Sequence, residues 1–324
     1  MPKAIMIREF GNSRVLQIEE VNIGSPGEGE LFISQSAIGV HYHDIYVRTG
    51  LYKTLNLPGV PGIEATGTVE SIGPGVTDFK RGDRIVYVTS SYGAYTTHRL
   101  LDARLAVKLP EFVSDELIAT NFSRALTVQM LTKQVLNLQS SHTILVTAAS
   151  GGVGRLLCQY ANSLGVRVIG SVSTFEKAEL ARSYGCDYSL IYGQQDFIRM
   201  VMDITDGKGV DVVYDSVGAD TFFQSLEVLS LCGHLVNFGQ SSGPVDPLRM
   251  TTLAKKSLTI SRPILFHYTA DTAIYKTMAY SVFNIFREGT LRLPPAEPRS
   301  LKDASTAHDI LESRRGGGSL YLVP

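Results

Sequence analysis

The residues with the clearest chemical potential are three glycines that separate an apolar run from a helical pattern. The run is Thr143–Thr147 (TILVT), and Gly151, Gly152 and Gly154 follow it. Because glycine has no side chain, backbone N–H groups can approach a diphosphate there, and the following helix would direct the positive end of its dipole at it. Ala149 occupies the first position of the usual G-x-G-x-x-G pattern, so the alternative is a turn that serves only packing. The sequence predicts a dinucleotide phosphate site here.

The end of the next predicted strand indicates which dinucleotide such a site would hold. The strand covers 166–171, and Ser173, Thr174 and Lys177 follow at its carboxyl end. A site that prefers NAD usually carries an acid at this point for the ribose 2′-hydroxyl, and a carboxylate would repel a 2′-phosphate. Hydroxyl and ammonium groups would donate to that phosphate, with Arg167 and Arg182 nearby as weaker candidates, so the sequence predicts NADPH as the cofactor. The alternative is that Thr174 caps a helix while Lys177 lies on its exposed face.

Length, charge and cysteine content limit the class of protein. The chain has 324 residues, a formal net charge of −1 and three cysteines, Cys158, Cys186 and Cys232. It is long enough for two domains, and its near-neutral charge makes nucleic acid an improbable partner. The cysteines lack C-x-x-C spacing and fall in apolar segments, so we expect reduced thiols. The charged start and the absence of any long apolar run predict a cytoplasmic protein with no membrane partner.

The pattern of apolar residues changes along the chain. Up to about residue 120, short apolar strands alternate with glycine-rich turns, which is typical of a small barrel. From 143 to 260, strands alternate with amphipathic helices, and we expect six strands that begin near 143, 166, 187, 210, 234 and 257. That number suits a complete dinucleotide fold. Helical stretches at 271–287 and 301–313 and a final strand at 319–323 are predicted to return to the first domain.

Several motifs together resemble one family, the medium-chain dehydrogenase/reductases, and within it the zinc-independent quinone oxidoreductases similar to zeta-crystallin. They are found at 50–52 (GLY), 73–76 (GPGV), 82–84 (GDR), 148–154 (AASGGVG), 213–218 (VYDSVG), 238–243 (FGQSSG) and 311–314 (LESR). The resemblance implies an α/β protein: a GroES-like barrel domain from 1–122 and 264–324, and a doubly wound Rossmann domain from 123–263. It further implies a cofactor held in a cleft and a homodimer.

Metal binding is not expected. The zinc enzymes of the family carry a Cys ligand after the segment that resembles Gly39-Val40, and they carry Gly-His-Glu where this chain has Gly62-Ile63-Glu64. Two ligands are therefore missing, and no cysteine precedes residue 158. His41 and His43 remain as a pair of imidazoles without obvious third and fourth ligands.

Candidate catalytic residues follow from the resemblance of 40–46 (VHYHDIY) to the family's loop beside the nicotinamide. Tyr46 or Tyr52 is expected to donate a hydrogen bond to a quinone oxygen, and simple packing is the alternative for both. Asp44 is expected to organise the loop, because an exposed carboxylate is ionised at neutral pH. His41 replaces the family's usual Asn, and its imidazole is a candidate proton donor.

Further cofactor contacts are carried over from the family in the same way. Tyr42 and Thr127 are expected near the nicotinamide, Met130 in the pocket wall, and Tyr192 near the adenine. Val217 is expected beside the ribose, and Arg314 is expected to face the phosphates, with a solvated cation as its alternative. The remaining candidates are residues of the cradle, of the turn after the fifth strand and of the segment after Pro263: Val153, Phe238, Gly239, Gln240, Ser241, Ser242, Ile264, Leu265 and Phe266.

The sequence therefore predicts an NADPH-dependent, zinc-free reductase that transfers a hydride to a small-molecule quinone. Reduction of 2-alkenals or enones is the first alternative, because a conjugated β-carbon makes similar demands on hydride geometry. A non-catalytic NADPH-binding or RNA-binding protein is the second, since a fold can keep its cofactor site and lose its chemistry.

Overall fold

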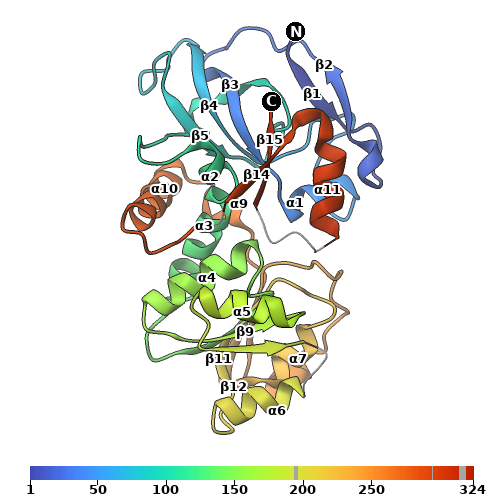
Figure 1. The fold of residues 1–324 in the computed structure, drawn as a ribbon, viewed down its shortest axis with the longest axis vertical. Helices are drawn as coiled ribbons and strands as arrows, with labels where there is room; N and C mark the ends of the chain where they lie inside the picture. The colour runs from blue at the N-terminus through green and yellow to red at the C-terminus, as the bar shows by residue number, and fades with distance from the viewer. Residues whose placement is uncertain (193–195, 294, 314–318) are drawn as a thin grey trace. The chain divides into compact units, whose positions relative to one another are not determined.

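The computed structural model describes residues 1–192, 196–293, 295–313 and 319–324. The chain divides into two compact units. Unit 1 contains Met1–Ser123, Thr269–Phe283 and Leu293–Pro324, and unit 2 contains Arg124–Tyr268 and Asn284–Arg292. Both chain ends therefore belong to unit 1, as Figure 1 shows by the blue and red ends of the ribbon. No helix among the described residues is both long enough and apolar enough to cross a membrane.

Unit 1 is built on a mostly antiparallel sheet with the path β14-β15-β3-β4-β5-β7, and β6 also pairs with β3. A separate hairpin-like pair joins β1 to β2. Along β3 the side chains of Leu31, Ile33 and Gln35 are buried, and the residues between them are partly exposed, which is the two-residue period of a half-buried strand. The strand bounds are β1 Lys3–Met6, β2 Gln17–Glu20, β3 Glu30–Gly39, β4 Glu64–Ile72, β5 Arg84–Val88, β6 His98–Asp102, β7 Ala106–Lys108, β14 Ala296–Ser300 and β15 Ser319–Val323.

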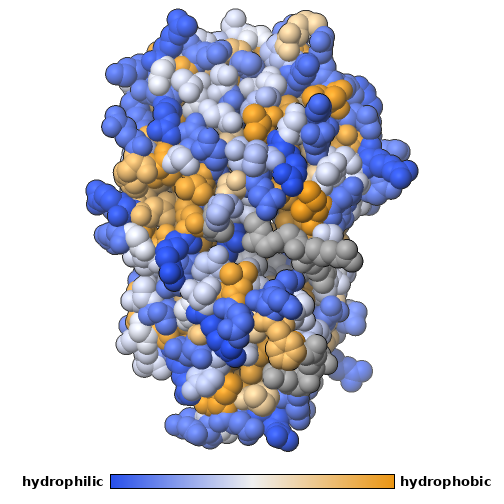
Figure 2. All heavy atoms as spheres, in the orientation of Figure 1, coloured by the Kyte–Doolittle hydropathy of each residue, from blue (hydrophilic) through white to orange (hydrophobic). Residues whose placement is uncertain are grey.

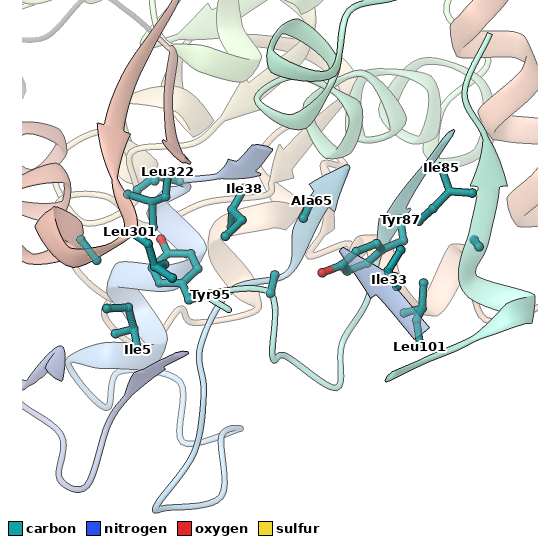
Figure 3. Packing of buried hydrophobic residues seen from close by; sticks show 14 of the residues in the cluster. Ile5, Ile33, Ile38, Ala65, Ile85, Tyr87, Tyr95, Leu101, Leu301 and Leu322 are labelled. Atoms are coloured by element: carbon teal, nitrogen blue, oxygen red, sulfur yellow. The ribbon is translucent and has the colours of Figure 1, made fainter. Parts of the chain in front are cut away.

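The core of unit 1 joins residues from both ends of the chain. Ile5, Ile38, Leu301 and Leu322 are all buried in one cluster (Figure 3). The helices of this unit are α1 Tyr42–Arg48, α2 Asp115–Ala119 and α11 Ala304–Glu312, and α10 Thr272–Arg287 begins in it. On the face drawn in Figure 2, apolar side chains are visible over α10, where Ile274 and Tyr280 are exposed. The rest of that face mixes polar and apolar groups in small areas.

Unit 2 contains a six-stranded parallel sheet with the order β10-β9-β8-β11-β12-β13. This order is that of a doubly wound dinucleotide fold, in which chain direction across the sheet reverses between the first and fourth strands. Ligands of such sheets bind at the carboxyl ends of the strands beside that reversal, here at β8 and β11. The strands are β8 Thr143–Thr147, β9 Arg167–Val172, β10 Tyr188–Ile191, β11 Val210–Asp215, β12 Leu229–Asn237 and β13 Thr259–Ser261.

Helices connect these parallel strands, and one further short helix, α9, follows β13. They are α4 Gly152–Ser163, α5 Phe175–Ser183, α6 Phe197–Ile204, α7 Phe222–Glu227, α8 Thr251–Ala254 and α9 Leu265–Tyr268. Before β8, α3 (Phe122–Gln129) continues into a π-helical turn at Met130–Val135.

The predicted fold class is confirmed, with one boundary clearly misplaced. The fifth strand begins at Leu229 and not near 234. It is irregular at its start, because its pairing with β11 shifts register between Val210 and Val212 and Cys232 adopts a left-handed backbone with φ of 62°. A Cys-Gly pair in that conformation has the composition of a turn, which concealed the first half of the strand.

Candidate active site

The glycine loop in unit 2 joins the end of β8 to the start of α4. Gly151 caps the helix in an extended conformation, and Ala148 turns the chain with a left-handed φ of 49°. A β-carbon on Gly154 would lie 2.3 Å from the carbonyl oxygen of Ala148, so a larger residue would push the loop away from the helix. The amides of Gly152 and Val153 belong to the first turn of α4, which has no intrahelical acceptors for them. The loop can thus present N–H groups to a phosphate.

The corner after β9 brings Ser173, Thr174 and Lys177 together. The Thr174 hydroxyl caps α5 by accepting from the backbone N of Lys177 at 3.3 Å, and Lys177 Nζ lies 3.2 Å from Ser173 Oγ. Thr174 therefore caps the helix, as the alternative had it. Ser173 and Lys177 still lie together at the corner as possible donors. Glu176 also lies in this first turn, where a hydrogen bond from Thr174 lowers the pKa of its carboxyl. The residue that directly follows β9 is Ser173 and not an acid.

The buried carboxylate of Asp215 organises the loops at the ends of β11 and β12. Its oxygens accept from Thr147 Oγ1 at 3.0 Å, Thr221 Oγ1 at 2.7 Å, Asn237 Nδ2 at 2.9 Å and the backbone N of Val217 at 3.0 Å. Asp215 is fully buried, and these donors supply the hydrogen bonds that its oxygens would otherwise make to water. Sequence reasoning quoted its motif but gave the residue no role. The available signal was the acid at the end of a largely apolar strand.

The turn Phe238–Gly243 after β12 is tied to the loop that follows β11. Ser242 donates to the carbonyl of Val217 from both its backbone N and its hydroxyl, each at 2.8 Å. Ser241 N donates to Ser216 O at 3.2 Å, and a β-carbon on Gly239 would lie 2.6 Å from that same oxygen. The turn and the loop after β11 thus lie together at the carboxyl edge of the sheet. They contain the sequence candidates Val217, Phe238, Gly239, Gln240, Ser241 and Ser242.

The other predicted cofactor residues are more dispersed in unit 2. Tyr192 follows β10 and donates its hydroxyl to Asp220 O at 2.6 Å, which places it beside the same loop. Thr127 is half-buried on α3, whereas Met130 is 1% exposed and packs inside the unit. Ile264 is 47% exposed just before Leu265 and Phe266, which open the short helix α9. Arg314 lies outside the described residues.

In unit 1, the segment predicted to carry catalysis is helix α1 and the residue before it. His41 caps the helix, and its backbone N donates to Asp44 Oδ2 at 2.8 Å. The imidazole is buried, with Nε2 2.7 Å from Glu64 Oε2. Glu64 is itself fully buried and accepts from the backbone N of Phe122 at 2.8 Å and from the N and hydroxyl of Ser123. Sequence reasoning missed Glu64 as the partner of His41, although it stands in the position of the glutamate in the zinc enzymes' Gly-His-Glu.

Asp44 is buried, not exposed as the sequence suggested. Its carboxyl has no solvent-accessible surface, and burial raises its pKa to about 6, opposed by the charge of His41. Its Oδ1 has no hydrogen-bond partner among the described residues, whereas Oδ2 accepts from Tyr95 at 3.2 Å as well as from His41 N. A short polar helix has the composition of a surface element, but the barrel core encloses this face of α1. The expected role of Asp44 in organising the segment is consistent with these contacts.

A hydrogen-bond chain connects Asp44 to helix α11. Arg48 is 1% exposed and binds Glu312 with two hydrogen bonds of 2.8 Å, while Arg48 Nη1 lies 3.4 Å from His308 Nδ1. His308 Nε2 in turn lies 3.0 Å from Tyr95 Oη. Burial and the Arg48 charge lower the pKa of His308 to about 3, so the ring is neutral. Since arginine only donates, Nδ1 accepts, Nε2–H donates to Tyr95, and the Tyr95 hydroxyl donates to Asp44.

Aromatic rings gather around the other side chains of α1. Tyr46 lies 5.1 Å from Tyr52 and 6.0 Å from Tyr42, measured between ring centroids. His43 lies 5.6 Å from Tyr52 and stacks on Tyr92 at 5.9 Å, with Nε2 3.3 Å from the Tyr92 hydroxyl. Burial and His41 lower the pKa of His43 to about 4, so this imidazole is neutral as well. Tyr42 donates to Leu311 O at 3.1 Å, a second link between α1 and the chain segment that contains α11.

These residues form a structural group that we call the ring wall: Tyr42, His43, Tyr46, Tyr52 and Tyr92. All but Tyr92 are half-buried, so part of each ring reaches the surface of unit 1. Neutral aromatic and phenolic groups of this kind can stack on a flat molecule and donate hydrogen bonds to its oxygens. Among the described residues, no group of three or more His, Cys, Asp or Glu side chains is arranged to hold a metal ion.

Comparison with known proteins adds to this picture. Residues 27–111 match the family described as alcohol dehydrogenase GroES-like domain, and residues 152–279 match the family described as zinc-binding dehydrogenase. A quinone oxidoreductase of Pseudomonas aeruginosa is 39% identical, with 100% of both chains covered. A 2-haloacrylate reductase of a Burkholderia species is 38% identical, with 100% of this chain and 99% of the relative covered. The crystal structure of Escherichia coli quinone oxidoreductase complexed with NADPH has a TM-score of 0.95, with 38% identity over 99% of this chain and 100% of its own.

A barrel-type unit together with a doubly wound unit that carries a glycine-loop dinucleotide site defines a class of oxidoreductases. The chain belongs to the medium-chain dehydrogenase/reductase family, among its zeta-crystallin-like quinone oxidoreductases. The resemblance predicted from the sequence is confirmed. The word zinc in one matched family's description refers to that family, whereas this chain carries Ile63 at a ligand position.

Asp44 should leave a signature in the pH dependence of stability. Between about pH 4 and 6 the folded chain holds a proton on Asp44 that the unfolded chain has released, so this group makes the fold less stable as pH rises. His43 and His308 act in the opposite sense, because the unfolded chain protonates them near pH 6.5 and the folded chain does not. We predict that Asp44→Asn steepens the loss of unfolding free energy on acidification by up to about 1.4 kcal/mol per pH unit in this window.

The measurement is urea unfolding at several pH values from about 4.5 to 6. Asp78→Asn is the matched control, since the Asp78 side chain is 73% exposed. The control should run parallel to the unmodified chain. If Asp44→Asn also runs parallel, then Asp44 is ionised in the folded chain across this range.

Proposed function

We propose that the chain is an NADPH-dependent quinone oxidoreductase that works without a metal ion. The observation that carries the proposal is the carboxyl edge of the unit 2 sheet, where the glycine loop and the Ser173–Lys177 corner offer N–H, hydroxyl and ammonium donors to a phosphorylated dinucleotide. The cofactor named in the crystal structure of the E. coli relative supports the same choice. When bound, NADPH supplies the hydride.

The roles of the two units follow from their residues. We assign the catalytic domain to unit 1 and the cofactor domain to unit 2, close to the limits 1–122 with 264–324 and 123–263 expected from the sequence. Gly151, Gly152, Val153 and Gly154 would hold the diphosphate, and Ser173, Thr174 and Lys177 would hold the 2′-phosphate. The turn Phe238–Ser242, with Val217, would hold the nicotinamide half.

The ring wall of unit 1 is proposed as the acceptor platform. A quinone is flat and carries two oxygens that gain charge as it is reduced, so it needs a stacking surface and hydrogen-bond donors. Tyr46 and Tyr52 offer both, and we propose that one of their hydroxyls donates to the quinone oxygen. His41 is better suited to positioning than to proton donation, because its Nε2 contacts buried Glu64. Asp44 then holds the start of α1.

A second candidate is the reduction of conjugated carbonyl compounds such as 2-alkenals. The specific observation in its favour is the 2-haloacrylate reductase that is 38% identical over the full chain. An acyclic acceptor would need the hydride and one hydrogen-bond donor to its carbonyl oxygen, but it has no ring to stack on the ring wall. The two candidates therefore make different demands on Tyr46 and Tyr52.

The first test is steady-state oxidation of NADPH with ring quinones, 2-alkenals and simple ketones. We expect quinones to give the highest kcat/KM, because only they use both the rings and the hydroxyl donors. Turnover of ketones alone would contradict the proposal, and tight RNA binding without NADPH oxidation would favour a non-catalytic protein. Tyr46→Phe and Tyr52→Phe keep the ring and remove the hydroxyl, and the one that donates should lower kcat for quinones about 10-fold or more.

The second test concerns the 2′-phosphate. Lys177→Glu should raise the KM for NADPH far more than that for NADH, since a carboxylate there repels the dianion that only NADPH carries. Arg199→Glu, on helix α6 and paired with Asp203, is the control. Equal effects of Lys177→Glu on both cofactors would remove Lys177 from the 2′-phosphate site.

We also propose that the chain forms a homodimer through the edge of the unit 2 sheet. Strand β13 is the last in the sheet order, and Leu231 on neighbouring β12 is 76% exposed. An edge strand beside an exposed apolar side chain is a natural pairing surface. Light scattering after size exclusion should give about twice the chain mass of 35.3 kDa, and Leu231→Lys should reduce it; a monomer at all concentrations would contradict this.

A cytoplasmic location is proposed from the thiols. Cys158 and Cys186 are free cysteines whose sulfur atoms lie 3.3 Å apart in the buried part of unit 2. Thiols this close persist in a reducing compartment.

A further inference from the structure

The side chain of Arg124 lies against the first residue of helix α4. Arg124 is on α3, the first residue of unit 2, and it is 7% exposed. A β-carbon added to Gly152 would lie 2.8 Å from Arg124 Nε, 2.9 Å from Cζ and 3.3 Å from Cδ. The guanidinium therefore occupies the space that any side chain at position 152 would need. Glycine at position 152 therefore leaves room for the Arg124 side chain, in addition to its role in the loop.

This position is electrostatically unusual. The N-terminus of a helix carries a partial positive charge, and α4 is a full helix of 12 residues. Cations are favoured at helix C-termini and disfavoured at N-termini, and a buried guanidinium is more costly still than an exposed one. An anion bound at this helix start would contact both the positive helix end and the guanidinium.

The corner of α5 shows the same arrangement. Lys177 lies in the first turn of that helix, and its own backbone N donates to the capping hydroxyl of Thr174. Each of the two helices that follow the first strands of the sheet thus begins beside a cation. A dinucleotide with a 2′-phosphate carries anionic groups at two places, the diphosphate and the 2′-phosphate, and the two cations are divided between the two helix starts in the same way.

We propose that Arg124 is a diphosphate-binding residue of the cofactor site. The inference rests on the dinucleotide part of the proposed function and is independent of the acceptor. The guanidinium would donate to the phosphate oxygens alongside the amides of α4, with the paired geometry that arginine offers to phosphate. Since the diphosphate is common to NADPH and NADH, Arg124 contributes affinity for both, whereas Lys177 distinguishes them.

The test compares Arg124→Gln, Arg124→Lys and Lys177→Gln in the full chain by calorimetric titration with NADPH, NADH and ADP. Arg124→Gln should weaken all three by a similar factor of about 10 to 100, the range for charge-assisted hydrogen bonds. Arg124→Lys should recover part of that loss, because it retains the charge but loses the fork. Lys177→Gln should weaken NADPH alone, and so serves as the matched control.

Thermal unfolding without ligand separates binding from a purely structural role. For Arg124→Gln, the rise in Tm on adding ADP should be smaller than for the unmodified chain, whatever the Tm of the ligand-free chain. A lower Tm without ligand together with unchanged ADP affinity would overturn the inference, and so would an effect confined to NADPH. If Arg124→Gln fails to fold, an Arg124→Lys chain that binds ADP as tightly as the unmodified chain likewise contradicts it.

The result also separates this inference from the proposed reaction. An unmodified chain that binds ADP and NADPH but reduces no quinone contradicts the reaction and leaves the role of Arg124 supported by the titrations. Unchanged ADP affinity in Arg124→Gln, alongside rapid quinone reduction, contradicts the role of Arg124 alone.

Discussion

Buried carboxylates fix the backbone in both units, because an acid removed from water must collect hydrogen bonds or give up its charge. Asp215 collects them from the strand ends of unit 2, and so holds the loop at Val217 that faces the proposed cofactor. Glu64 collects backbone donors from the segment at 122–123 and contacts His41. Asp44 has fewer donors than either, and its raised pKa reflects that difference. The loops that carry the candidate site are thus held by buried acids that are not exposed on the surface.

The parallel sheet could be predicted from sequence because its signals are local. Apolar strands such as Thr143–Thr147 are separated by helices of regular period, and the glycine loop marks the first crossover. The helix cap at Thr174 and the hydroxyl groups beside it could also be predicted, since capping depends on residues three positions apart. The start of the fifth strand was not readable, because Cys232 adopts a backbone conformation that its residue type rarely takes.

The burial of α1 could not be predicted, because it depends on residues far away in the chain. Arg48 is matched by Glu312, and Asp44 by Tyr95, so the environment of this helix comes from elements that its own sequence does not describe. The partner of His41 was more accessible. Glu64 interrupts an apolar stretch at the start of a strand, and a single acid in such a place signals a buried polar contact.

The chain of hydrogen bonds behind α1 also has a direction. Each group in the order Arg48, His308, Tyr95 and Asp44 donates to the next. A proton that leaves Asp44 cannot be replaced along this route, because the route begins at a guanidinium that keeps its protons at any pH the fold tolerates. This chain of hydrogen bonds therefore cannot conduct protons to Asp44 from the arginine end. A tyrosine of the ring wall that donated a proton to an acceptor, as proposed, would therefore regain it from water and not through this chain of hydrogen bonds.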